Sequence, residues 1–441
     1  MKRSSKRLMV KKSPFSGKRL ILALCACFFV VFSIFSVNIY SYMQQIYIEY
    51  NNYKEKDYYT SQNIGIMQKG KVSFISDRDM ASASDDHFIL SIDGGGIFGI
   101  IPIMALQDLA QCLQSSHGSR DLYKYFDVIA GNSTGAIIAA GLVTPKGGQK
   151  TESVDINEIY DLYARHGAEI FPEKYKGFID RALSLLLRKA LYDNTGRKKI
   201  LHEKLQDHTS NEALTDFVIP FYDTTTGPIY FTRNHGSHSY EPDGALSQDA
   251  ENAIAKMVDI AMYSSSAPIY FNPYKGDTSE EKIGNKKIEK FYPYTAYDGA
   301  LYQNNPALLG IVEGRRDFPH GRFHIVSLGT GISYRGSMLG PLDPAHPASQ
   351  KSNINLISAL LPSFMEGNAL GVDEFLRSEP NIDYIRIDVP LNSGMDLSMD
   401  NPSQKHIDDI RASVIAASSM NRPIIQKVCR KLISYRPSVG Q

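Results

Sequence analysis

The stretch at residues 131–135, Gly-Asn-Ser-Thr-Gly, limits the possible folds of this chain more than any other feature. It lies between two short apolar runs, so the pattern predicts a strand, a sharp turn and a helix. A Cβ atom at Gly131 or Gly135 would crowd the close approach of strand and helix. The turn would lift the hydroxyl of Ser133 clear of the sheet and set it near a helix N-terminus, where developing negative charge is tolerated. A chance pentapeptide in a loop is the alternative, and the flanking runs favour the turn.

A second strand, turn and helix precede this one. Residues 87–92 (HFILSI) predict a strand, residues 93–99 (DGGGIFG) a glycine turn, and the apolar positions from 100 to 113 a helix. A glycine turn of this kind can cradle a dinucleotide, but no acidic ribose-binding residue follows at the expected distance in residues 115–122. It also lacks the Gly-Lys-Ser/Thr of a P-loop. The remaining interpretation is an oxyanion pocket made of backbone N–H groups, on an α/β fold.

A serine hydroxyl needs a base to remove its proton. Asp298, followed by Gly299, is a candidate carboxylate. A Ser-His-Asp order also remains open, because four histidines follow Asp298 in the chain, at positions 320, 324, 346 and 406. None of the four stands in a distinctive setting, and His324 lies inside an apolar strand. The sequence therefore favours direct deprotonation of Ser133 by Asp298.

Three motifs in this order, at residues 93–99, 131–135 and 298–300, resemble the patatin family of acyl hydrolases. The segments 264–268 (SSSAP) and 327–331 (SLGTG) are secondary matches, and the resemblance covers residues 87–431. It implies a three-layer αβα fold with a mostly parallel central sheet, and activity on the acyl esters of phospholipids or other lipids.

The resemblance also implies roles for individual residues. Ser133 and Asp298 would form a catalytic dyad without histidine, and the N–H groups of Gly94, Gly95 and Gly96 would form the oxyanion hole. The other motif positions are Asp93, Gly99, Gly131, Gly135 and Gly299. No cofactor is expected, and no metal, because no cluster of His and Asp has ligand spacing. One position departs from the family: Phe98 stands where Arg or Lys is usual, which bears on the strength of the pocket and on any preference for anionic head groups.

The N-terminus predicts a membrane anchor. Residues 1–19 hold eight Lys or Arg and no acid, and residues 20–37 are 18 residues without a charge, just enough to cross a bilayer. We predict a basic cytosolic arm at 1–19, a transmembrane anchor at 20–40, a tether at 41–85 and a catalytic domain at 86–435, on the opposite side of the membrane from the arm. A cleaved signal peptide, a lipoprotein signal at residues 24–27 and a secreted form are the alternatives.

Charge and cysteine content narrow the class further. Without the arm the chain has 40 basic and 47 acidic residues, a net charge of −7, which argues against nucleic acid as a partner. Four cysteines, two of them in the apolar run, predict no disulfide framework, zinc site or redox pair. Residues 178–191 combine apolar and basic side chains, which predicts a half-buried helix or flap; a helix resting on lipid is the alternative.

Together these features predict a membrane-anchored serine acyl hydrolase whose partner is a lipid substrate at a membrane surface. Two other functions remain open. One is a Ser-His-Asp carboxylesterase acting on soluble esters, and the other is an inactive lipid-binding module of the same fold.

Overall fold

The computed structural model describes residues 86–147, 149–172, 190–239, 253–277, 294–332, 353–392 and 394–436. The chain divides into two compact units, Met1–Asn52 and Tyr53–Gln441, and all described residues belong to the second. The predicted arm, anchor and tether lie outside the described residues, as does nearly all of the predicted helix at 178–191.

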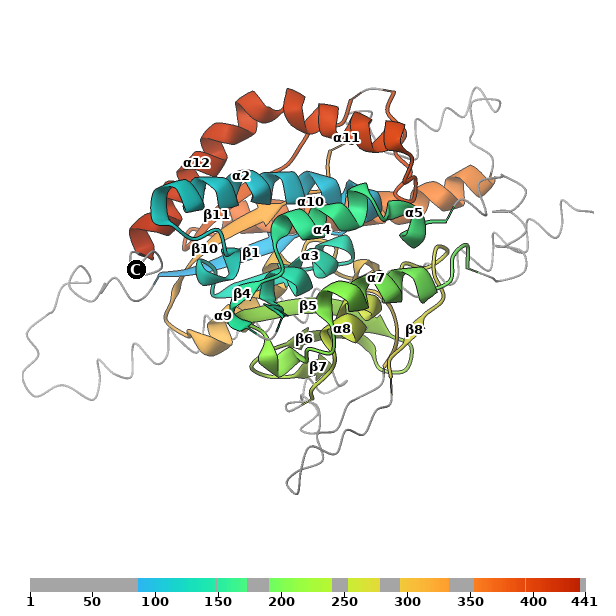
Figure 1. Cartoon of the computed structure of the whole chain (residues 1–441), viewed down its shortest axis with the longest axis horizontal. Coiled ribbons are helices and arrows are strands. Elements are labelled where there is room, and N and C mark those ends of the chain that lie inside the picture. Colours follow the sequence, from blue (N-terminus) through green and yellow to red (C-terminus); the bar gives the residue numbers. More distant parts are fainter. Residues whose placement is uncertain are drawn as a thin grey trace, which may run out of the picture. The chain divides into compact units, whose positions relative to one another are not determined.

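A nine-stranded sheet forms the centre of the described part of the chain (Figure 1). Its strands are β1 (Asp86–Ile92), β2 (Val128–Gly131), β5 (Asp216–Asp223), β6 (Gly227–Thr232), β7 (Ser237–Ser239), β8 (Tyr274–Lys275), β9 (Thr295–Asp298), β10 (Arg322–Leu328) and β11 (Ile382–Ile387). The order is β11-β10-β1-β2-β5-β6-β7, with β9 also paired to β5 and β8 to β9. The run from β11 to β5 is parallel and the remaining pairs are antiparallel. The predicted mixed α/β fold with a mostly parallel central sheet is confirmed.

Helices cover both faces of this sheet. They are α2 (Ile100–His117), α3 (Thr134–Val143), α4 (Ile156–Ala164), α5 (Gly167–Ile170), α7 (Thr195–Leu205), α8 (Met257–Ser264), α9 (Ala307–Asp317), α10 (Asn353–Ser378), α11 (Gln404–Ala416) and α12 (Ser418–Tyr435), with short 3-10 helices η1 (Gly96–Gly99), η2 (Leu122–Lys124), η4 (Ser210–Glu212) and η5 (Gly299–Leu301). A separate pair, β3 (Pro145–Lys146) and β4 (Gln149–Ser153), precedes α4.

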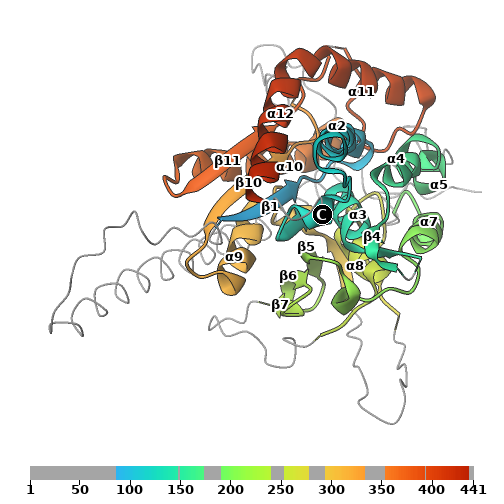
Figure 2. The same ribbon diagram turned by 60° about the vertical axis from the view of Figure 1, so that its left-hand side comes forward.

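The alternation of side chains along β1 explains the two covered faces. Phe88, Leu90 and Ile92 join the large apolar core that contains α2 and α12, whereas Ile89 points to α9, where it lies under Gly310. Figure 2 shows α2 and α12 on one side of β1 and α9 on the other. Because β1 and β2 are buried on both faces, each contains a continuous apolar run, residues 88–90 in β1 and 128–130 in β2, which is typical of parallel strands inside an α/β fold.

Two helices differ from what the sequence predicts. The apolar pattern predicts one helix over residues 403–431, but the chain forms α11 and α12 with a break at Ala417. It also predicts a helix over residues 250–263, but residues 253–256 are not helical and α8 begins at Met257.

A disulfide corrects the expectation from the cysteine count. Cys112 of α2 and Cys429 of α12 are joined, with their Cα atoms 6.3 Å apart. The two residues are 317 positions apart in the chain, so their spacing gives no signal in the sequence. They meet because α2 and α12 pack against each other on the same face of the sheet.

One helix among the described residues, Gly96–His117, has the length and apolar composition of a membrane span, and 61% of its most apolar window is buried inside the protein. Length and composition do not distinguish a span from a core helix, and this helix packs in the core.

Candidate active site

Ser133 occupies a strained turn between β2 and α3. Its backbone has φ 54° and ψ −118°, a conformation that non-glycine residues rarely adopt, and its side chain is 7% exposed. The residue is the N-cap of α3, so its hydroxyl lies at the positive end of that helix. The predicted strand, turn and helix are confirmed.

Close approach explains the two glycines that flank the serine. A Cβ atom on Gly131 would lie 2.1 Å from the carbonyl oxygen of Gly135, and one on Gly135 would lie 2.1 Å from that of Ile92. Real Cβ contacts are never so short, so α3 passes β1 and β2 at a distance that only glycine permits. A Cβ atom would also collide at the other motif glycines, Gly99 and Gly299.

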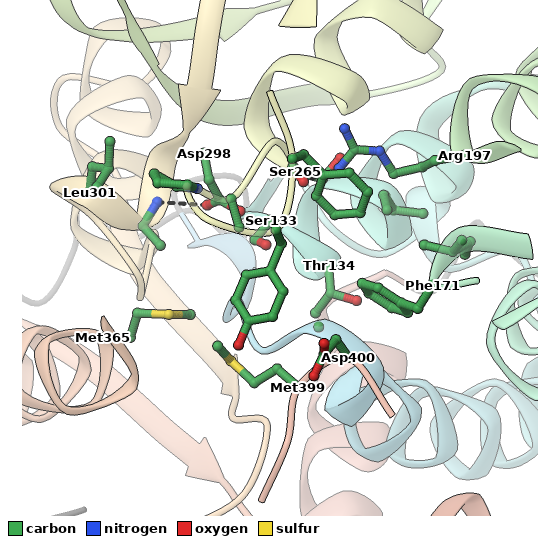
Figure 3. Close-up of a pocket in the computed structure, with 18 of the residues that line it drawn as sticks. Ser133, Thr134, Phe171, Arg197, Ser265, Asp298, Leu301, Met365, Met399 and Asp400 are labelled. Carbon is green, nitrogen blue, oxygen red and sulfur yellow. Dashed lines mark hydrogen bonds between the residues drawn. The ribbon is translucent and has the colours of Figure 1, made fainter. Parts of the chain in front are cut away.

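Asp298 ends β9, which pairs with β5, and its side chain is almost completely buried. Its Oδ1 accepts a hydrogen bond of 2.8 Å from the Ala300 amide (Figure 3). Burial raises the pKa of Asp298 to about 6, and hydrogen bonding to the side chain of Ser133 lowers it against this trend, as does the charge of Arg197. The carboxyl group is therefore mostly ionised at neutral pH, and its raised pKa makes it a better proton acceptor than an ordinary aspartate.

A three-serine segment, residues 264–266, connects Ser133 to Asp298. The amide of Ser133 donates to Ser264 Oγ at 3.0 Å, and the amide of Asp298 donates to the Ser266 carbonyl oxygen at 3.0 Å. Both residues are thus fixed through their backbone amides to positions two apart at the end of α8. This gives a structural role to the SSSAP segment that the sequence showed as a secondary match.

Arg197 of α7 fixes the same segment from behind. Its guanidinium group donates to the Ser265 carbonyl oxygen, to Ser266 Oγ at 2.9 Å and to Asn194 Oδ1 at 2.7 Å. It also lies 3.9 Å from the centre of the Phe271 ring. The side chain is fully buried, which lowers its pKa to about 9, and it lines the same pocket as Asp298.

The glycine turn after β1 lies beside Ser133. A Cβ atom on Gly94 would come within 3.0 Å of Ser133 Cβ, and Gly96 lines the same pocket as Ser133 and Asp298. The Gly94 amide donates to the Asn304 carbonyl oxygen at 3.3 Å, so this donor has a partner. The Gly95 and Gly96 amides donate to no backbone carbonyl of the described residues. The role of the three glycine amides as an oxyanion hole stays a prediction.

Asp93 anchors the start of the glycine turn. Its Oδ2 accepts a 2.7 Å hydrogen bond from Arg386 of β11, and the same guanidinium group donates to Asp388 Oδ2 at 2.8 Å and to Ser327 Oγ at 2.8 Å. Burial raises the pKa of Asp93 to about 6, although the charge of Arg386 opposes this. Thr330 Oγ1 donates to the Gly94 carbonyl oxygen at 2.8 Å, so β10 and β11 both hold the turn in place.

The pocket around Ser133 and Asp298 has mostly apolar walls. Figure 3 shows the two residues side by side, with Leu301 and Met365 on one side and Thr134 and Phe171 on the other. Further apolar or aromatic side chains that line it are Ile137, Tyr163, Ile170, Pro268, Tyr270, Phe271 and Met399. No histidine is among the described residues that line this pocket.

Two of the four histidines that follow Asp298 in the chain, His324 and His406, lie outside the lining of the Ser133 pocket. His324 bonds Asp86 and Asp383 at the start of the parallel strands, the opposite end from Ser133. His406 packs edge-on against Phe98, with 5.4 Å between ring centres. The position that departs from the family pattern, Phe98, is thus a buried ring.

The sequence did not single out Arg197, Arg386 or Asn304. Arg197 lies on α7, whose sequence does not separate an apolar face from a polar face. Arg386 lies in β11, far along the chain from the glycine turn. Only the folded chain brings Arg197 to the three-serine segment and brings Arg386 and Asn304 to the glycine turn after β1.

The fold and the pocket define a class: an α/β protein that presents a serine on a strained strand-to-helix turn, beside a buried carboxyl group. A sequence model described as "Patatin-like phospholipase" matches residues 90–311. The chain belongs to this family.

Individual relatives agree with the family assignment. The chain is 37% identical over 260 residues to Patatin-like protein 2 of Arabidopsis thaliana. The aligned region covers 55% of this chain and 59% of that protein. It is 30% identical over 346 residues to Patatin-07 of Solanum tuberosum, covering 73% and 80%. A solved structure titled human GIVD cytosolic phospholipase A2 aligns with 82% of this chain and covers 62% of its own chain. The sequence identity is 12% and the TM-score is 0.39.

Proposed function

We propose that this protein is a serine acyl hydrolase that releases fatty acids from phospholipids or other lipid esters, with Ser133 as nucleophile and Asp298 as general base. Family membership supports lipid acyl hydrolysis as the activity. The observation that carries the proposal is the meeting of Ser133 and Asp298, 165 positions apart in the chain, in one largely apolar pocket.

The reaction has two steps. Asp298 takes the proton of the Ser133 hydroxyl while its Oγ attacks the ester carbonyl carbon, and the oxyanion receives hydrogen bonds from the Gly95 and Gly96 amides. The alcohol leaves with the proton from Asp298. A water molecule then gives its proton to Asp298 and attacks the acyl-serine, and the fatty acid leaves as the proton returns to Ser133.

The environment of Asp298 suits a base in this reaction. A carboxyl group with a pKa of about 6 accepts a proton far more readily than an exposed aspartate. The segment 264–266 holds base and nucleophile at a fixed separation, which reduces the entropy lost on reaching the reactive geometry. The apolar walls suit a fatty acyl chain.

We further propose that residues 20–40 anchor the enzyme, so that the catalytic domain faces the membrane from the non-cytosolic side. The Cys112–Cys429 disulfide supports this side, because such bonds persist in oxidising compartments. An anchor would keep the pocket close to bilayer substrate and raise its effective concentration.

The test is fatty-acid release from phospholipid vesicles by the full-length protein. Ser133→Ala and Asp298→Asn are each expected to remove release, whereas Ser378→Ala and Asp408→Asn, exposed residues away from the pocket, should leave it unchanged. Hydrolysis by a folded Ser133→Ala protein at the wild-type rate would refute the proposal.

The two alternatives make different predictions in the same assay. A Ser-His-Asp esterase requires that His324→Asn or His406→Asn be as inactive as Ser133→Ala while remaining folded. An inactive binding module predicts that the wild-type protein is never labelled by a fluorophosphonate.

A further inference from the structure

Three asparagine side chains form a series of hydrogen bonds behind the Ser133 pocket. They are Asn132, between β2 and α3; Asn304, between η5 and α9; and Asn368, on α10. We refer to them as the asparagine relay. Asn132 and Asn304 are buried and Asn368 is half-buried. None of the three is among the described residues that line the Ser133 pocket, so a role in the reaction would have to act through other residues.

The inner end of the relay contacts the surroundings of both Ser133 and Asp298. Asn132 directly precedes Ser133, and its Oδ1 accepts a hydrogen bond of 3.4 Å from Ser264 Oγ. The same Ser264 Oγ accepts from the Ser133 amide. Burial raises the pKa of Asp298, and hydrogen bonding to the Asn132 side chain opposes this rise. A hydrogen bond with this effect is donated to the charged form of the acid, so the Asn132 amide group faces the carboxylate.

Two motif glycines leave the space that the Asn132 amide occupies. A Cβ atom on Gly299 would lie 2.4 Å from Asn132 Oδ1, and one on Gly94 would lie 2.8 Å from Asn132 Nδ2. The latter would also lie 2.6 Å from Asn304 Oδ1. Real Cβ contacts are essentially never so short, so the turn after β1 and the turn after Asp298 both fit closely around this amide. The close fit restricts the orientation of an amide whose hydrogen bonds are long.

The outer end of the relay is fixed by α10. Asn304 Oδ1 accepts from Asn132 Nδ2 at 3.4 Å, and the Asn304 carbonyl oxygen accepts from the Gly94 amide at 3.3 Å. Asn368 Oδ1 accepts from the Asn304 amide at 2.7 Å, and its Nδ2 donates to the Tyr302 carbonyl oxygen at 3.0 Å. Because one carboxamide both accepts from and donates to the same backbone segment, the position of α10 determines the position of Asn304.

We propose that the asparagine relay positions the general base. Asn368 fixes Asn304, and Asn304 orients the amide of Asn132. That amide holds the Asp298 carboxylate toward Ser133. All three asparagines are thus positioning residues, and α10 takes part in the reaction through a side chain that touches neither reacting group. The inference rests on the proposed function, because the relay acts through the proposed base.

The test is fatty-acid release by the full-length protein between pH 5 and pH 9, with thermal unfolding to check that each variant is folded. Asn368→Ala is expected to lower kcat about tenfold to 100-fold. It should also raise the pH midpoint of release by about half to one unit, since a loosened Asn132 amide lets the pKa of Asp298 rise. Glu374→Gln, an exposed residue of α10, is the control and should match wild type in both. Met365→Ala changes the pocket wall one helical turn away, and should alter KM without moving the midpoint.

A double-mutant cycle separates the relay from a general loosening of the fold. Asn132→Ala removes the donor itself and should raise the midpoint at least as much as Asn368→Ala. When both substitutions are combined, the shifts should not add, because the two residues act through one hydrogen bond to Asp298. Additive shifts, or a folded Asn368→Ala protein with lowered kcat and an unchanged midpoint, would overturn the relay in favour of a purely structural role.

Urea unfolding gives a readout that needs no catalysis. The difference in the free energy of unfolding between proteins with and without Asp298→Asn depends on pH through this carboxyl group. Asn132→Ala should enlarge that dependence, because it raises the pKa of Asp298 in the folded state. If the wild type hydrolyses no lipid ester at any pH, the proposed function fails, and this enlargement still decides whether Asn132 acts on Asp298. Release by the wild type without a shift in either measurement would overturn the relay alone.

Discussion

Asp298 is predicted to destabilise the folded protein in proportion to its ionisation. The folded state raises its pKa from 3.8 to about 6, so the fold holds the proton more tightly than the unfolded chain does. Stability is therefore lost as the pH rises through this window, at about 1.4 kcal/mol per pKa unit. Asparagine carries no charge at any pH. The free energy of unfolding of Asp298→Asn, relative to wild type, should thus increase by about 2–3 kcal/mol between pH 4 and pH 8.

The assay is urea unfolding of both proteins at several pH values, with the disulfide kept intact. The difference between the two proteins isolates this group from Asp93, whose pKa is raised in the same direction. Ser378→Ala, at an exposed position and without a titratable group, is the control and should differ from wild type equally at every pH. If the difference in the free energy of unfolding between Asp298→Asn and wild type does not change with pH, the carboxyl group is not in the buried environment described. The proposal that Asp298 is a general base with a raised pKa would then be contradicted.

Four further outcomes follow from the same geometry. Fatty-acid release should rise with pH through about 6 and level off above it, as Asp298 ionises; a flat profile from pH 5 to 8 would contradict this. Arg197→Met should lower kcat at least about 100-fold with little change in KM, since Arg197 holds the serine segment and not the lipid, and Arg197→Lys should recover part of the loss. Gly135→Ala should destabilise the fold by more than about 3 kcal/mol in urea unfolding, because its Cβ would lie 2.1 Å from the Ile92 carbonyl oxygen. Cys429→Ser should cost about 2–5 kcal/mol in the same measurement, and wild type under reducing conditions should match it.

The local parts of the fold could be predicted because each depends on neighbours in the chain. The strand over residues 87–92 and the turn at Ser133 follow from apolar runs that end at glycine-rich segments, and the structure has both, with the strand beginning one residue earlier. Helix ends were less predictable. The break at Ala417 is one such case: Ser418, Ser419 and Pro423 follow it, but these residues do not fix the position at which one helix ends and the next begins.

Interactions between distant parts of the chain could not be predicted in this way. Arg386 meets Asp93 across 293 positions because β11, β10 and β1 lie in register, and register is a property of the assembled sheet. The hydrogen bond from the Gly94 amide to the Asn304 carbonyl oxygen is another such contact. The cysteine pair belongs with these, since two helices must first pack before the thiols can meet.

This crosslink has a consequence for biosynthesis. The helix that follows the glycine turn carries Cys112, whereas Cys429 lies in α12, 317 positions later in the chain. The bond therefore cannot close before α12 has been made and has left the ribosome. In a cell, this half of the domain stays without its covalent link until then, and a product truncated before α12 would never acquire it.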